Sequence, residues 1–200
     1  ISLGNEVATV TAGLQISPFI NATLVGFAGA PANASFVPGI WILTGGNLAH
    51  VDGKLSSGGF WVPDAFRADF NVGGLTVSGM TRTKDNGGNS YTAAAVTGSL
   101  GGLNFGYGYQ KSGSTSTVED TGNPNLGVTN HVLSVSTGIG DVTVSGAIAS
   151  MKNAVADTSA TGYSISAFTP LAPSLSGGVI YSHSGLDAES FAKSQVGVSL

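Results

Sequence analysis

From Phe66 onward, apolar and polar positions alternate along most of the chain in runs of about ten residues. One face of each run is apolar or aromatic, whereas the other carries Ser, Thr, Asn or Gly. A strand that separates lipid from water has this two-faced pattern. The sequence therefore predicts an all-β protein, an antiparallel up-and-down transmembrane β-barrel.

The clearest hairpin spans residues 66–84 and turns at Gly73 and Gly74. Two consecutive glycines suit a two-residue turn in which both central positions need positive φ. Pairing outward from this turn sets Val72 opposite Leu75. Each Lys or Arg near the middle of a bilayer would cost about 2–4 kcal/mol, so the polar face must meet water. The apolar face carries Phe66, Ala68, Phe70, Val72, Leu75 and Val77, and the polar face carries Arg67, Asp69, Asn71, Thr76, Ser78, Arg82 and Lys84.

Three further hairpins follow, with predicted turns at residues 99–101, 139–140 and 170–174. Pairing outward from the first and last of these turns sets Tyr91 against Tyr109 and Tyr163 against Tyr181. Both pairs then lie roughly 20 Å from the short turns along the membrane normal. An aromatic girdle is expected at that depth, so these four tyrosines are predicted to lie at the membrane interface.

The connections predict which side of the membrane each end of the hairpins occupies. The short turns alternate with mostly longer polar loops at residues 85–90, 112–129, 152–161 and 185–189. Outer-membrane barrels have short periplasmic turns and longer extracellular loops. The long loop at 112–129 contains Glu119 and Asp120, which could bind a cation or fold into the lumen, although a solvated surface loop is the simpler interpretation.

The first 65 residues have a weaker pattern. Residues 8–16 alternate as a strand, and Ser17 with Pro18 then turns the chain into a second predicted strand at 19–28. Residues 36–44 and 48–55 form a candidate hairpin. The whole chain, residues 1–200, is thus one β-barrel domain or a fragment of a larger barrel, with about 12–14 strands. A count of about thirteen is odd, so we expect that an N-terminal strand is missing, misread, or supplied by a longer parent chain.

Composition excludes several other classes of protein. Only 9% of the residues are charged, against roughly 25% in ordinary soluble domains. The hydrophobic fraction of 42% is too high for a disordered chain. No apolar run is long enough for a transmembrane helix. A net charge of −4 gives no basic patch, so no nucleic-acid partner is expected, and zero cysteines exclude thiolate chemistry.

Residues 103–109 (LNFGYGY) and 175–181 (LSGGVIY) resemble strands of the bacterial outer-membrane porin family, and residues 196–200 resemble a porin's last strand. The glycine- and serine-rich character is also similar to the barrels of surface-layer-associated porins. The sequence departs from the family at Leu200, where porins have a terminal aromatic residue. The resemblance implies an outer-membrane location, a lipid bilayer as partner, passive diffusion of small hydrophilic solutes or ions, and a homo-oligomer.

Six residues are candidates for the pore lining because they lie on predicted water-facing strand faces, where charges tune ion preference. The other interpretation is a solvated sheet face whose ion pairs contribute little. Glycines at 106 and 108 leave space, which argues against a filled barrel that serves only as an anchor. The pore-lining candidates are Arg67, Asp69, Arg82, Lys84, Asn104 and Gln110.

No catalytic, cofactor or metal site is expected. The histidines, His50, His131 and His183, lie in different predicted hairpins without ligand spacing. No nucleophile motif or acid–base pair stands out, so an enzyme is not predicted. A secreted structural protein, such as a surface-array, adhesin or matrix subunit, remains the alternative, because its composition would be similar.

Overall fold

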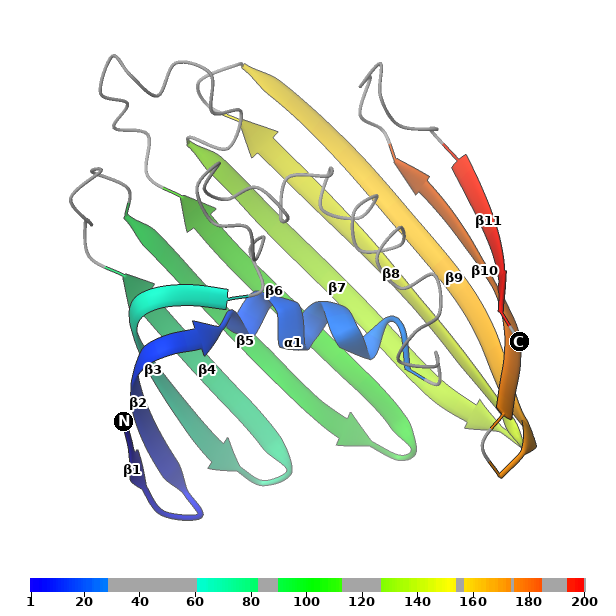
Figure 1. The fold of residues 1–200 in the computed structure, drawn as a ribbon, viewed down its shortest axis with the longest axis horizontal. Helices are drawn as coiled ribbons and strands as arrows, with labels where there is room; N and C mark the ends of the chain where they lie inside the picture. Colours follow the sequence, from blue (N-terminus) through cyan, green and yellow to red (C-terminus); the bar gives the residue numbers. More distant parts are fainter. Residues whose placement is uncertain are drawn as a thin grey trace.

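The computed structural model describes residues 1–28, 61–82, 90–112, 127–153, 157–173, 175–184 and 194–199. These residues form one helix and eleven strands, and every strand pairs antiparallel with its neighbours in chain order (Figure 1). The predicted all-β, antiparallel up-and-down architecture is confirmed. The elements are β1 (Ser2–Gly4), β2 (Ala8–Ile16), α1 (Pro18–Val25), β3 (Trp61–Val72), β4 (Leu75–Arg82), β5 (Tyr91–Leu100), β6 (Leu103–Ser112), β7 (Val128–Ile139), β8 (Val142–Asn153), β9 (Thr158–Ala172), β10 (Leu175–Ser184) and β11 (Ser194–Ser199).

The sheet is curved, and α1 lies across its concave side (Figure 1). In the described part of the chain, β1 and β11 are the two edges of the sheet. No helix among the described residues has the length and apolarity that a membrane crossing requires.

The two faces of the sheet differ in chemistry as predicted. On the outer face, large apolar side chains are exposed, including Phe66, Val135 and Ile165. On the inner face, many of the alternating positions of the same strands are small or polar, such as the buried Ser134 and Ser166, and others carry buried apolar side chains, such as Val132. Within the residues that the structure describes, these apolar side chains are left exposed, and such an outward apolar face is suited to lipid.

The turn glycines fix the register of the first two hairpins. Gly73 and Gly74 have φ of 57° and 83°, and Val72 pairs with Leu75 as predicted. Gly101 and Gly102 form the same two-residue turn, with φ of 58° and 84°, where a three-residue turn at 99–101 was predicted. The predicted pairing across β5 and β6 is therefore wrong. Tyr91 pairs with Ser112, and Tyr109 pairs with Ala94.

The last tyrosine pairing is also wrong by a shift of two residues. β9 continues through Ala172, so the turn comes later than predicted and Tyr163 pairs with His183. Tyr163 and Tyr181 remain diagonal neighbours on the same face, with ring centroids 6.0 Å apart. Strand extension also removes most of the predicted loop at 152–161, because β8 runs to Asn153 and β9 begins at Thr158.

The predicted strand at 19–28 is wrong, because α1 begins at Pro18. The Ser17 side chain accepts a hydrogen bond from the Phe19 amide at 3.2 Å and caps the helix, and proline is favourable in the first helical turn. A continuous apolar run does not distinguish a short strand from a buried helix. The candidate hairpin at residues 36–55 lies outside the described residues, and so does His50.

Candidate functional site: the inner wall and its helix

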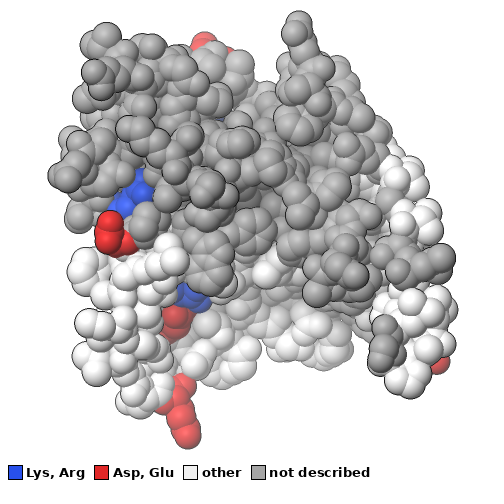
Figure 2. All heavy atoms as spheres, in the orientation of Figure 1, with Lys and Arg blue, Asp and Glu red and all other residues white. Residues whose placement is uncertain are grey.

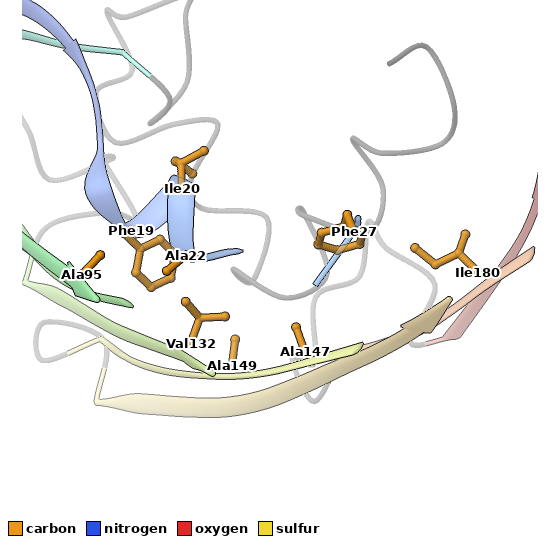
Figure 3. Packing of buried hydrophobic residues seen from close by; sticks show 9 residues of the cluster. All are labelled: Phe19, Ile20, Ala22, Phe27, Ala95, Val132, Ala147, Ala149 and Ile180. Atoms are coloured by element: carbon orange, nitrogen blue, oxygen red, sulfur yellow. The ribbon is translucent and has the colours of Figure 1, made fainter. Parts of the chain in front are cut away.

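Helix α1 packs its apolar side chains against the inner face of the sheet. Phe19 and Ile20 are both fully buried. Phe19 points toward small side chains of the wall, whereas Ile20 points away from the strands (Figure 3). Phe27, just beyond α1, extends this cluster toward β10, and the wall residues of the cluster come from β5, β7, β8 and β10. They are Ala95, Val132, Ala147, Ala149 and Ile180. Burial of this apolar surface holds α1 on the wall.

Glycines on β6 make room for the helix. A Cβ added to Gly106 would lie 2.6 Å from the Ala22 carbonyl oxygen, and one added to Gly108 would lie 3.0 Å from the Ala22 Cβ. The prediction that these two glycines leave the lumen open at this height is therefore wrong. The space above them holds the backbone of α1.

Buried hydrogen bonds fix the start of α1. The Tyr91 hydroxyl donates to Gln110 Oε1 at 2.7 Å, and it lies 2.6 Å from Ser17 Oγ. Because the tyrosine proton is used on Gln110, the Ser17 hydroxyl must donate to Tyr91. Further along α1, the Ser134 hydroxyl donates to the Ala22 carbonyl. The serines of the inner wall thus satisfy polar groups that α1 brings into the interior.

Tyr91 therefore does not lie at the membrane interface as predicted. Its side chain is 1% exposed and lies on the inner face, whereas the interface prediction needs an outward side chain. The other three predicted interface tyrosines, Tyr109, Tyr163 and Tyr181, do lie on the outer face. The Tyr107 hydroxyl, which the prediction omitted, is hydrogen-bonded to His131 Nδ1 at 2.9 Å. The rings of His183 and Tyr163 are in contact, with their centroids 5.2 Å apart and their planes tilted by 33°.

The charged pair of the inner wall lies on β3. Arg67 holds both oxygens of Asp69 through Nε at 2.9 Å, and its Nη1 donates to the Ile16 carbonyl at 2.9 Å. The Ser78 hydroxyl on β4 also donates to Asp69. Both charged side chains keep some exposure, 14% for Arg67 and 22% for Asp69. Blue and red atoms adjoin over the β2–β4 edge of this face (Figure 2).

The other predicted pore-lining residues have different environments. Arg82 faces inward and is 3% exposed, and Gln110 is buried beneath the start of α1. Asn104 lies near the short-turn end, with its Nδ2 3.4 Å from Ser136 Oγ. Lys84 lies outside the described residues. Of the five candidates that the structure describes, Arg67, Asp69 and Asn104 combine an inward position with some exposure.

The described residues contain no group of three or more His, Cys, Asp or Glu side chains that could hold a metal ion. The described inner wall instead offers hydroxyls, amides and the Arg67–Asp69 ion pair. These groups can contact water and hydrated solutes through hydrogen bonds. The sequence pattern identified the wall and missed α1, although Ser17 followed by Pro18 is a helix-start signal.

Comparisons with known proteins agree with this geometry. No protein-family model and no curated protein matches the sequence. Among solved structures, the chain is similar to OmpT expressed in the outer membrane of Vibrio cholerae, with 15% identity, a TM-score of 0.62 and coverage of 98% of this chain and 61% of that chain. It is also similar to an anion-selective porin from Comamonas acidovorans, with 15% identity, a TM-score of 0.68 and coverage of 92% and 55%.

The chain has the fold of bacterial outer-membrane β-barrel proteins, which confirms the predicted fold class and the resemblance in architecture. It spans about 55–61% of the length of these two solved chains. At 15% identity the likeness concerns the fold alone. This fold and the apolar outer face agree with the predicted location in the lipid bilayer of a bacterial outer membrane.

Proposed function

We propose that the chain forms the wall of a porin-like channel through which small hydrophilic solutes or ions diffuse passively, without enzymatic activity. The observation that carries this proposal is the contrast between the two faces of one sheet, apolar outside and hydroxyl- and amide-bearing inside. A polar inner wall with partly exposed charges at Arg67 and Asp69 suits a water-filled passage.

In this proposal α1 narrows the passage. It lies on the inner face of β4–β8 and occupies space that the wall would otherwise leave to water (Figure 1). The ion pair on β3 lies beside the entry to α1, since Arg67 holds the Ile16 carbonyl two residues before the helix begins. Passing ions would therefore meet Arg67 and Asp69 next to the narrowed region.

A second candidate is a barrel that anchors a cell-surface protein and conducts nothing. The packing of α1 against Gly106 and Gly108 favours it, because a helix seated on the wall reduces the open cross-section. The two candidates predict opposite results in a conductance measurement.

The test is single-channel recording of the purified protein in planar bilayers. The channel proposal predicts discrete conductance steps, whereas a protein that inserts and never conducts is an anchor. Two matched variants examine the inner wall. Arg67→Gln should favour cations and Asp69→Asn should favour anions, each changing the permeability ratio by about two- to fivefold, because a unit charge near a passing ion in water contributes about 1 kcal/mol. Reversal potentials that stay unchanged in both variants would show that Arg67 and Asp69 do not line the pore.

A further inference from the structure

Toward the strand ends that lie away from the short turns, the outward surface of β6–β9 changes from apolar to polar. One row across these strands consists of Lys111, Thr129, Lys152 and Ser159, which are successive register partners. The neighbouring row consists of Tyr109, His131, Ser150 and Thr161. Both rows lie at the end of the strands away from the short glycine turns. On the outer face of a membrane barrel, such a change marks the level of the lipid headgroups.

The members of these two rows on β7–β9 line a groove of about 660 Å³, and Lys111 and Tyr109 continue the rows beside it on β6. Its outward-facing lining residues carry hydroxyls, an imidazole and an ammonium group. They are Thr129, His131, Ser150, Lys152, Ser159 and Thr161. A groove that presents several hydrogen-bond donors around one cation is suited to an oxyanion.

The charge of the rows is positive. Lys111 and Lys152 are exposed on strands separated by β7, so their backbones lie about 10 Å apart. Neither lysine has an ion-pair partner among the described residues. The exposed carboxylate of Asp157 lies beyond Ser159, at the start of β9, and does not cancel two lysines. A ligand with more than one negative group could engage both ammonium groups.

Apolar side chains continue the surface below these rows. Leu133 and Ile148 are register partners on β7 and β8, are about half exposed, and lie next toward the short-turn end. Ile165 on β9 is 57% exposed one step further. A ligand that contacts both the polar rows and the apolar side chains beside them therefore needs an anionic headgroup, such as a phosphate, and apolar tails.

We propose that the rows on β6–β9 bind the phosphate-bearing headgroup of a membrane lipid in the leaflet on the long-loop side, with its acyl chains against Leu133 and Ile148. Lys111 and Lys152 contact the phosphate oxygens, while His131 and the groove hydroxyls donate hydrogen bonds. Tyr107, hydrogen-bonded to His131, holds the imidazole at the boundary. This site depends on insertion in the membrane and is independent of conduction through the lumen.

The test measures binding of lipid A with two phosphates to the protein in detergent micelles, by native mass spectrometry. Lys111→Gln with Lys152→Gln should raise the apparent Kd about 30-fold, from about fivefold for each lysine near a charged lipid surface. Lys111→Arg with Lys152→Arg keeps both charges and should bind within about twofold of the original protein. Each single glutamine variant should lose about fivefold, which preserves the test if the double variant does not fold.

Two further ligands separate the alternatives. Dephosphorylated lipid A should bind the original protein as weakly as intact lipid A binds the double glutamine variant. Inorganic phosphate in large excess should leave lipid A bound. Equal binding of both lipids, or equal binding by the double glutamine variant and the original protein, overturns the proposal. Displacement by inorganic phosphate overturns the assignment to a lipid. Conductance of the double glutamine variant should be unchanged, so this test and that of the channel can fail separately.

Discussion

At the scale of single residues, the inner wall is built to accept a helix backbone. Gly106 and Gly108 allow α1 to approach β6. Ser134 donates a hydrogen bond to the buried Ala22 carbonyl and so replaces the water that this carbonyl loses on burial. Larger side chains at these positions would be compatible with a strand and incompatible with the helix. The small and hydroxyl side chains therefore have a specific role in docking α1.

Gly106→Ala should destabilise the fold by about 1–3 kcal/mol, because the new methyl group would lie 2.6 Å from a backbone oxygen of α1. Gly79→Ala is the matched control, since a Cβ there meets nothing within 4 Å. Urea unfolding in detergent compares the two variants. Equal stability of both would mean that α1 does not pack on β6 as described.

Tyr91→Phe should cost about 1–3 kcal/mol, because it leaves Gln110 and Ser17 in the interior without their shared hydroxyl partner. Tyr109→Phe is the control on the neighbouring strand, with its side chain on the outer face. The same unfolding measurement applies. A larger loss in the Tyr109 variant would contradict the assignment of Tyr91 to the buried network.

At the scale of elements, α1 is the one helix in the described part of an otherwise β-stranded chain. It follows β2 directly and crosses to β5–β8, so it connects the first strands to the middle of the sheet (Figure 1). The cluster around Phe19 and Ile20 determines where α1 sits, because isolated helices of this length are not stable in water.

Phe19→Ala should remove about 3–5 kcal/mol of packing free energy and release α1 from the wall. If α1 narrows the passage, single-channel conductance should rise in this variant. Asn21→Ala changes the same helix at a half-buried position outside the cluster and should leave conductance unchanged. A fall in conductance in the Phe19 variant, with the fold intact, would contradict a narrowing role for α1.

The elements also show what the sequence could and could not reveal. The period-two alternation around Phe70 and Val77 gave the correct faces, because a strand that separates lipid from water must alternate. The position of Tyr91 could not be read in this way, because the pairing of β5 with β6 is shifted by three residues from the predicted one. A register shift by an odd number of residues exchanges the face of one strand relative to its partner. Likewise, nothing local in residues 19–28 reveals that the sheet offers glycines at the place where a helix would dock.

At the scale of the whole molecule, one curved sheet separates two environments. Its outer face places large apolar side chains toward lipid, and its inner face places serines, amides and an ion pair around α1. The outer-membrane barrel fold, the proposed channel and the proposed lipid site all depend on this separation. A secreted structural protein would instead bury the apolar face against another sheet or another copy of the chain.

Site-directed fluorescence labelling of β3 and β4 tests this separation most directly, and the chain has no cysteine to interfere. Single cysteines would replace Phe70 or Val77 on the outer face, and Asn71 or Thr76 on the inner face. In vesicles, brominated lipids should quench the fluorescence of a label at position 70 or 77. A water-soluble quencher should quench the fluorescence of a label at position 71 or 76. Quenching that fails to alternate between the two faces would contradict the account.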